Sequence, residues 1–278
     1  DNRNNMIMGI VLNALLLWDY KYMLKLEKWR SSNSENFDNW IKVISEFDAF
    51  SSLANFAYNN RQFVFPDVHQ KEFKLEMKDA GHPLIPDNMR INNDLVVNGK
   101  SNFFIITGAN MAGKSTFLRT VGVNLVMAMA GAPVCASRFV FKPVDVFTGM
   151  RTSDSLQKNE SYFFAELSRL KTLIDLLRKG KEMFVILDEV LKGTNSKDKR
   201  LGSLALLRQL VGMEATGIIA THDVSLGDLE KEFPNNVSNR RFEVEIENDE
   251  LIFDYKLKTG ISRNLNATFL MKKMGITI

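Results

Sequence analysis

The first 60 residues carry the hydrophobic pattern of helices. Between Met6 and Trp29, apolar residues recur three and four positions apart, as they do on one face of a helix. The polar run Ser31–Ser34 predicts the end of that helix, and the same spacing from Phe37 to Ala57 predicts a second one. We therefore expect a helix–loop–helix segment whose apolar stripe, with all three tryptophans, packs against another part of the protein. A ligand site built from the tryptophans is the alternative.

A different pattern begins near Gln62. Short strand-like pieces and the turn-forming segment Gly81–Pro86 come first, and apolar strands then alternate with helical runs. We predict strands at 63–65, 73–77, 101–107, 134–141, 144–150, 183–190 and 216–221, helices at 114–130, 162–178 and 200–211, a hairpin around Asn248-Asp249 and a last helix at 265–274. This alternation predicts an α/β fold for a domain spanning residues 61–278.

Composition and charge narrow the class of protein only slightly. The 278 residues are 45% hydrophobic, enough for a full core, and a net charge of +3 is too small to indicate a nucleic-acid partner. Cys135 is the single cysteine, so we expect a buried thiol and a reducing, cytoplasmic compartment. The apolar stretch Met6–Trp18 is shorter than the roughly 20 residues of a membrane span, and no signal-peptide pattern is visible. Because the sequence starts at Asp1, without methionine, we expect a fragment of a longer chain.

The strongest chemical signal is the segment from Gly108 to Ser115, which follows an apolar strand and precedes an apolar helix. Backbone N–H groups of a glycine-rich turn at a helix N-terminus can enclose the oxygens of a polyphosphate. Lys114 would then reach the β- and γ-phosphates, and Ser115 would hold Mg²⁺. The predicted nucleotide-binding residues are Gly108, Ala109, Asn110, Met111, Ala112, Gly113, Lys114, Ser115 and Thr116. An accidental loop rich in glycine and serine is the alternative.

Two carboxylates follow the apolar strand that begins at Met183. Acids at the carboxyl end of a buried parallel strand lie where α/β sheets place ligand chemistry. Asp188 is the candidate Mg²⁺ partner, opposite Ser115, and Glu189 can orient and deprotonate an attacking water. The alternative is a solvated strand end.

Two further polar positions sit at the ends of predicted elements. His222 follows the apolar run Gly217–Ala220 and could hydrogen-bond a γ-phosphate or the attacking water, while the alternative is a capping turn in which Asp223 starts the next helix. Ser161 stands where a helix begins, so its hydroxyl and the neighbouring N–H groups could meet a phosphate. Taken alone, Ser161 is only a helix cap.

Together these motifs resemble the ATPase domain of the MutS family of DNA mismatch-repair proteins. The resemblance covers residues 80–275 and rests on Thr107–Arg119, Asp188-Glu189, Gly193–Asp198, Ala220–Asp223 and Tyr255–Gly260. The pair Asn110-Met111 inside the phosphate loop is its most specific mark. Residues 44–54 are similar to the last helix before that ATPase, so residues 1–60 would be a helical remnant of the family's core and lever region.

The resemblance implies a P-loop NTPase of the ABC-ATPase type that uses ATP and Mg²⁺ and works as a homodimer, or as a heterodimer with a related chain. Lys114, Glu189 and His222 would be the catalytic residues, with Glu189 as general base and His222 as the switch histidine. Ser161 would be the signature serine that reaches the ATP of the other subunit, and Asp198 would lie in a loop linking the two sites. DNA binding would depend on domains outside this sequence.

Several positions depart from the family's pattern. Ala109 and Ala112 stand where the family usually has proline and glycine, and these small changes should leave the phosphate loop intact. Asn159-Glu160 replaces Gly-Arg in the signature segment, which bears on the contact between subunits and on the hydrolysis rate. The segments Val190–Lys192 and Asn264–Thr268 also differ from the family's usual sequence. We interpret the chain as a divergent member.

The mismatch-reading element of the family is a Phe-x-Glu string in an N-terminal domain, which stacks on the mispaired base. Here only Phe164–Glu166 fits it, inside a predicted helix, and we interpret the match as coincidence. Three functions stay open: an ATPase that couples turnover in a dimer to mismatch repair, a MutS-like ATPase in another DNA or membrane-associated process, and a nucleotide-binding interaction module with little turnover.

Overall fold

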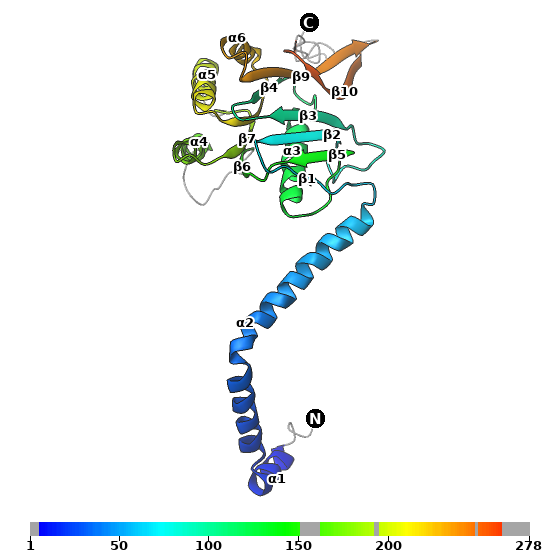
Figure 1. Ribbon diagram of the computed structural model, residues 1–278, viewed down its shortest axis with the longest axis vertical. Coiled ribbons are helices and arrows are strands. Elements are labelled where there is room, and N and C mark those ends of the chain that lie inside the picture. The colour runs from blue at the N-terminus through cyan, green and yellow to red at the C-terminus, as the bar shows by residue number, and fades with distance from the viewer. Residues whose placement is uncertain (1–5, 151–161, 192–194, 248–249, 263–278) are drawn as a thin grey trace. The chain divides into compact units, whose positions relative to one another are not determined.

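The computed structural model describes residues 6–150, 162–191, 195–247 and 250–262 (Figure 1). The chain divides into two compact units, Asp1–Asn59 and Asn60–Ile278. The predicted last helix at 265–274 and the predicted turn at Asn248-Asp249 lie outside the described residues.

The first unit contains α1 (Met6–Leu16) and α2 (Trp18–Asn59). The predicted loop at Ser31–Ser34 is wrong, because α2 continues through these residues. Ser32 Oγ donates to the carbonyl oxygen four residues earlier at 2.9 Å, and Asn33 Nδ2 does the same at 2.7 Å. Bonds of this kind destabilise a helix only slightly and satisfy the polar side chains within it, so the run does not end the helix.

The interruption in this unit falls at Leu17, whose φ of 44° is left-handed. Asn13 caps the start of α2, since its side chain accepts the N–H of Asp19 at 2.8 Å and donates to the Asp19 carboxylate at 2.7 Å. The apolar stripe is exposed: α2 has no buried residue, and the side chains of its tryptophans are 36%, 53% and 40% accessible. Among the helices that the structure describes, none is both long and apolar enough to cross a membrane.

The second unit has two sheets within its described ranges. Four strands form the first in the order β1-β5-β2-β3, and six form the second in the order β10-β9-β4-β8-β7-β6 (Figure 1). The strands are β1 (Asp67–Val68), β2 (Lys74–Ala80), β3 (Asn93–Asn98), β4 (Phe103–Thr107), β5 (Arg138–Phe141), β6 (Asp145–Gly149), β7 (Met183–Asp188), β8 (Thr216–Thr221), β9 (Val237–Glu247) and β10 (Glu250–Thr259). The pairs β6·β7, β7·β8, β8·β4 and β4·β9 are parallel, which confirms the predicted α/β organisation.

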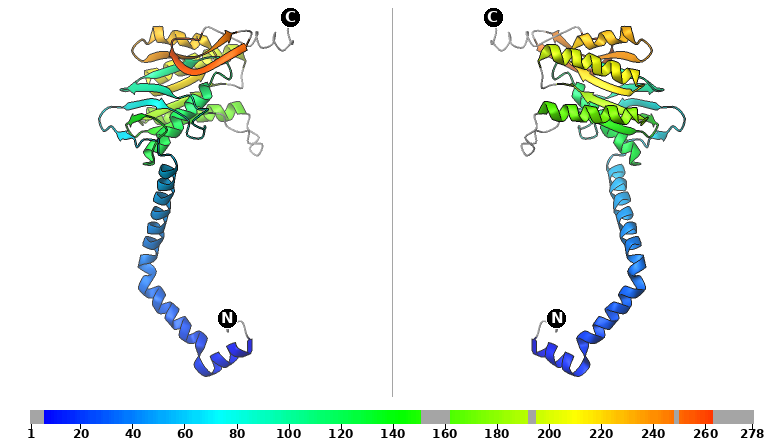
Figure 2. Two further views of the ribbon diagram at one scale, coloured as in Figure 1. Left: turned by 90° about the vertical axis from the view of Figure 1, so that its right-hand side faces the viewer. Right: turned by 90° about the vertical axis from the view of Figure 1, so that its left-hand side faces the viewer.

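Helices cover both faces of the six-stranded sheet, as Figure 2 shows. They are α3 (Lys114–Met129), α4 (Tyr162–Arg178), α5 (Ser196–Gly212) and the short α6 (Leu229–Glu232), which follows a 3₁₀ turn at Val224–Asp228. Phe184 and Ile186 of β7 pack on the α3 side, while Val185 and Leu187 pack in a second core with α4 and α5. The strands are therefore buried on both faces, which explains their unbroken apolar runs.

Some predicted boundaries are wrong for local reasons. The strand at 63–65 reduces to one bridge between Val64 and Val134, each close to a proline that cannot donate a ladder hydrogen bond. The strand predicted at 183–190 ends at Asp188, because the next residue has a left-handed φ. α5 begins four residues before the predicted start, where the Asn195 side chain accepts the N–H of Asp198 at 2.9 Å. The strand β3 has no counterpart in the prediction.

Candidate nucleotide-binding site

The phosphate loop joins β4 to α3 at the carboxyl edge of the six-stranded sheet. β4 is buried along its whole length and pairs with β8 on one side and β9 on the other, so the loop leaves a rigid centre. It borders a cavity of about 930 Å³, large enough for a nucleotide-sized ligand. The predicted residues Ala109, Asn110, Met111, Ala112, Gly113, Lys114, Ser115 and Thr116 all line this cavity.

Two glycines of the loop are required by close approach. At Gly108 a Cβ would lie 2.6 Å from the carbonyl oxygen of Phe242 on β9, so any side chain would push the loop away from the sheet. Gly113 has a φ of 100°, which residues with a side chain rarely adopt, and a Cβ there would lie 3.0 Å from the ring of Tyr255. The loop therefore holds its shape against the β9–β10 hairpin.

Lys114 is the first residue of α3 and is buried, with 7% of its surface accessible. Its ammonium donates to the carbonyl oxygens of Gly108 and Ala109 at 2.6 and 2.7 Å. A buried cation needs such partners, and phosphate oxygens would be stronger ones. Ser115 follows on the same helical turn and is half-buried at the cavity wall.

Asp188 and Glu189 line the same cavity from the end of β7. Asp188 is 6% accessible, which rules out the alternative of a freely solvated strand end. Glu189 has a φ of 54°, and its N–H donates to the carbonyl oxygen of Ala220 at 2.9 Å. The left-handed turn directs the chain out of the sheet immediately after the strand.

His222 follows β8 and contacts the carboxylate of Glu189 through its Nδ1 atom. The capping alternative also holds for its neighbour: Asp223 accepts the N–H of Ser225 at 3.0 Å and starts the 3₁₀ turn. The capping turn and a role for His222 at the site are compatible, since Asp223 caps the turn while His222 contacts Glu189. Ser161, the remaining predicted site residue, lies outside the described part of the chain.

One wall of this cavity is apolar, and it was not predicted from the sequence. It is formed by the segment between β2 and β3, including Leu84, Met89 and Ile91, which are 84%, 72% and 44% accessible. His82 opens this segment, and burial together with Arg119 lowers the pKa of its imidazole, so His82 is neutral near pH 7 and can accept the N–H of Leu84. The turn residues Gly81–Pro86 signalled a loop, but spacing alone could not show which cavity it borders.

Tyr255 is a second unpredicted lining residue, contributed by β10. A bulge between Phe253 and Leu257 leaves Tyr255 with a φ of 51°. Asn93 bridges this bulge, because its Nδ2 donates to the Tyr255 carbonyl at 3.0 Å and its Oδ1 accepts the Leu257 N–H at 2.7 Å. The ring of Tyr255 stacks on Phe253 at 5.7 Å between centroids.

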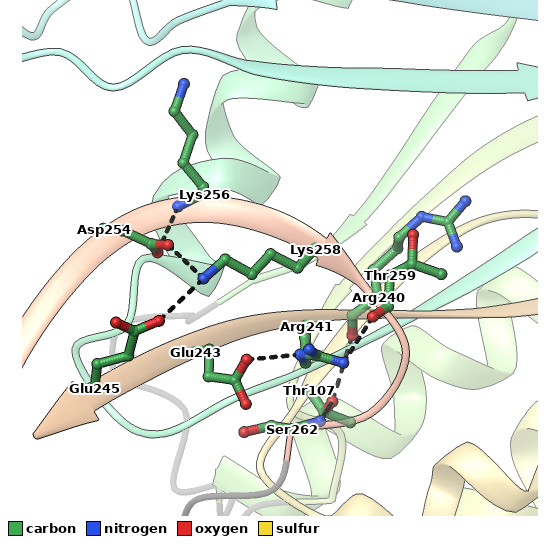
Figure 3. A network of polar contacts seen from close by, with 10 residues as sticks. All are labelled: Thr107, Arg240, Arg241, Glu243, Glu245, Asp254, Lys256, Lys258, Thr259 and Ser262. Carbon is green, nitrogen blue, oxygen red and sulfur yellow. Dashed lines mark hydrogen bonds and ion pairs between the residues drawn. The ribbon is translucent and has the colours of Figure 1, made fainter.

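The hairpin that carries Tyr255 is tied together and to β4 by polar contacts (Figure 3). Lys258 pairs with Asp254 at 2.7 Å and with Glu245 at 3.5 Å. At the end of β10, the Ser262 N–H donates to the hydroxyl of Thr107, the last residue of β4, at 2.8 Å. The wall of the cavity is thus anchored to the strand that delivers the phosphate loop.

Comparison with known proteins identifies a matching family model and several related sequences. Residues 104–272 match the family model described as MutS domain V. The chain is 33% identical over 238 residues to the DNA mismatch repair protein MutS of Thermotoga maritima, covering 84% of this chain and 29% of that protein. It is 30% identical over 239 residues to MutS of Thermotoga petrophila, and 29% identical over 262 residues to MutS of Persephonella marina, or 85% and 93% of this chain. The chain spans about 30% of the length of these relatives.

Proposed function

The chain belongs to the MutS family, and from this premise we propose that its second unit binds and hydrolyses ATP as a phosphate-loop domain of the ABC-ATPase type. One observation carries the proposal. The phosphate loop, Asp188 and Glu189 line a single cavity of about 930 Å³, and His222 contacts Glu189. These are the groups that phosphoryl transfer needs: a cradle for the phosphates, a metal partner and a residue that orients water.

In this proposal the loop and Lys114 hold the triphosphate. Backbone N–H groups at the start of α3 face its oxygens, and the Lys114 ammonium exchanges the carbonyls of Gly108 and Ala109 for the β- and γ-phosphates. Ile91 of the apolar wall and Tyr255 of β10 accept the base. An apolar wall favours the flat ring of a base, because the wall and the face of the ring are both poorly hydrated and contact removes them from water.

The residues present fit a magnesium ion that arrives with ATP. Mg²⁺ prefers oxygen ligands and is usually held by one or two protein groups together with phosphate oxygens and waters. Ser115 offers a hydroxyl and Asp188 a carboxylate, and both residues line the cavity. Within the described ranges, no group of three acidic, histidine or cysteine side chains is arranged to hold a metal ion. The bound ion would neutralise charge on the phosphates.

Glu189 is the proposed general base. Its carboxylate would accept a proton from the water that attacks the γ-phosphate, and His222 would orient the carboxylate and sense the γ-phosphate. Asp198 stands in the first turn of α5, close in sequence to Glu189. We propose that Ser161 completes the site of a partner subunit, so that two chains share two sites.

In the family, ATP turnover serves DNA mismatch repair, and we propose the same role for the protein to which this chain belongs. Reading of mismatches would depend on other domains, because Phe164–Glu166 lies in α4 and Glu166 is engaged with the backbone of Leu191.

Steady-state hydrolysis of Mg·ATP by the 278-residue chain tests the enzyme assignment. Lys114→Ala should weaken ATP binding by roughly 30-fold or more, since charge-assisted bonds to phosphate are lost. Glu189→Gln should bind ATP normally and lose turnover. Lys142→Ala is the control, because Lys142 is a partly buried lysine that pairs with Glu182 away from the cavity. Wild-type turnover in Lys114→Ala would refute the site, and negligible turnover in the wild type, unchanged in Glu189→Gln, would favour the interaction module.

Two further assays address the partners. Mixing Ser161→Ala with Lys114→Ala should restore one intact composite site in a heterodimer, and a complete lack of recovery would count against the role of Ser161. Binding of matched, mismatched and branched duplexes across a salt series should show no mismatch preference for this chain alone, because contacts to phosphates do not read sequence. A clear preference would contradict the assignment of mismatch reading to other domains.

A further inference from the structure

The backbone just after β7 is held in an uncommon conformation. Glu189 and Leu191 have φ angles of 54° and 59°, while Val190 lies between them. Residues with a side chain rarely adopt this left-handed region, and it persists only where surrounding contacts enforce it. The proposed general base is therefore the first residue of a turn that needs support from elsewhere.

Among the described residues, three contacts support this turn. The N–H of Glu189 donates to the carbonyl of Ala220, as described above. Leu191 is buried at 8% accessibility and packs against Gly202 of α5, where a Cβ would lie 2.5 Å from its Cδ1 atom. The N–H of Leu191 donates to the carboxylate of Glu166 at 2.8 Å, in a partly buried setting. Of these three partners, Glu166 alone makes its contact through a charged side chain.

Glu166 is itself held in place by its helix. Later turns of α4 bury Leu170, Leu173 and Ile174 in the core under the sheet. The guanidinium of Arg169 lies over the ring of Phe147 on β6 at 5.6 Å. The carboxylate therefore reaches the Leu191 N–H from a helix that is fixed to the sheet, and the hydrogen bond joins α4 to the turn after β7.

We infer that Glu166 is a positioning residue for Glu189: it holds the Leu191 amide and so keeps the carboxylate of Glu189 aligned with the γ-phosphate. The inference rests on the proposed ATPase function. Small displacements of a catalytic group lower the rate of the chemical step far more than they lower affinity for the substrate. Glu166 borders neither the phosphate loop nor the apolar wall, so its loss should act on turnover and leave ATP binding unchanged.

The experiment compares Glu166→Ala, Glu166→Gln and Glu230→Ala in the 278-residue chain. ATP affinity is measured by equilibrium titration, hydrolysis by single turnover, and protection of the Leu191 amide by hydrogen–deuterium exchange. Glutamine keeps an oxygen that can accept the N–H, whereas alanine removes it. Glu230 is the matched control, because its carboxylate also accepts a backbone N–H, that of Asn239 at 3.1 Å, outside the cavity.

Glu166→Ala should lower the single-turnover rate roughly 10- to 100-fold with ATP affinity within about twofold of wild type. It should also expose the Leu191 amide to exchange, and Glu166→Gln should restore both the rate and the protection. Glu230→Ala should keep the wild-type rate. A wild-type rate in Glu166→Ala, an equal loss in Glu230→Ala, or no rescue by glutamine would overturn the inference. A wild-type chain that binds ATP but never hydrolyses it would instead overturn the proposed function, and the role of Glu166 with it.

Discussion

Substitution of Asn124 on α3 tests how buried hydrogen bonds connect the cavity to the core of the second unit. This residue is fully buried, and its amide closes a ring of hydrogen bonds with two other segments. Its Nδ2 donates to the carbonyl of Gly81 at 3.0 Å, and its Oδ1 accepts the N–H of Cys135 at 2.8 Å. The Gly81 N–H donates in turn to the Cys135 carbonyl at 2.9 Å. The helix after the phosphate loop is thereby tied to the segment that opens the apolar wall.

Asn124→Leu preserves the branched shape of the side chain and removes these two hydrogen bonds. It also removes a third, from Nδ2 to the carbonyl oxygen of Thr120, four residues earlier, at 2.8 Å. It leaves one buried carbonyl and one buried N–H unpaired, at about 1–3 kcal/mol each. The apolar replacement returns about 1–2 kcal/mol by burying hydrocarbon where an amide stood. We expect the free energy of unfolding of the second unit to fall by about 2–4 kcal/mol, which corresponds to about 5–15 °C in melting temperature.

The assay is scanning calorimetry with urea denaturation followed by circular dichroism. Tryptophan fluorescence provides an internal control, since Trp18, Trp29 and Trp40 all belong to the first unit and should report no change. Asn33→Leu is the matched variant: Asn33 also donates to a carbonyl four residues earlier, but in an exposed setting, and its loss should cost less than about 0.5 kcal/mol. A loss below about 1 kcal/mol in Asn124→Leu, or an equal loss in both variants, would refute this account of the ring.

Three further predictions concern the loop, the thiol and the hairpin. Gly113→Ala should weaken ATP binding about 10-fold in equilibrium titrations because of its φ and the Tyr255 ring, whereas Gly131→Ala, with a φ of 79° but nothing within 4 Å, should not. Burial raises the pKa of the Cys135 thiol, so the native chain should resist alkylation and lose stability as the pH rises above about 8.5, less so in Cys135→Ala. Partial burial opposes ionisation of Asp254, but Lys258 and the Lys256 N–H lower its pKa overall. The stability advantage of wild type over Asp254→Asn should therefore be present at pH 7, begin to decrease in urea titrations below the ordinary value of 3.8, and be lost as the pH falls through the lowered pKa of the native state.

The sequence predicted best those elements whose signal is local and strong. The bounds of α4 and β8 coincide with the prediction, because each is set by an unbroken apolar pattern between turn-forming residues. The loop between β4 and α3 was located for the same reason, since strand, loop and helix follow one another along the chain, while phosphate binding by this loop stays a prediction. The continuation of α2 through Ser31–Ser34 was missed because composition cannot show whether a serine bonds back onto its own helix.

The apolar wall could not be predicted, because it depends on contacts between segments far apart in the sequence. Tyr255 reaches the cavity only through a bulge that Asn93 bridges, and these two residues are 162 positions apart. β3, which carries Asn93 at its start, gives a weak pattern because half of its residues face solvent. A local pattern contains neither the bulge nor its partner.

The cavity-lining residues with left-handed backbone conformations also depend on contacts from segments far away in the sequence. Met111, Glu189 and Tyr255 all line it, with φ angles of 66°, 54° and 51°. Each such residue costs free energy, so its conformation must be enforced by groups from other elements. For Tyr255 that group is the amide of Asn93, and for the turn that begins at Glu189 it is the carboxylate of Glu166. Asn93 lines the cavity, whereas Glu166 does not. Substituting Glu166 should therefore disturb the site without removing a lining residue, which is why Glu166→Ala and Glu166→Gln separate geometry from chemistry.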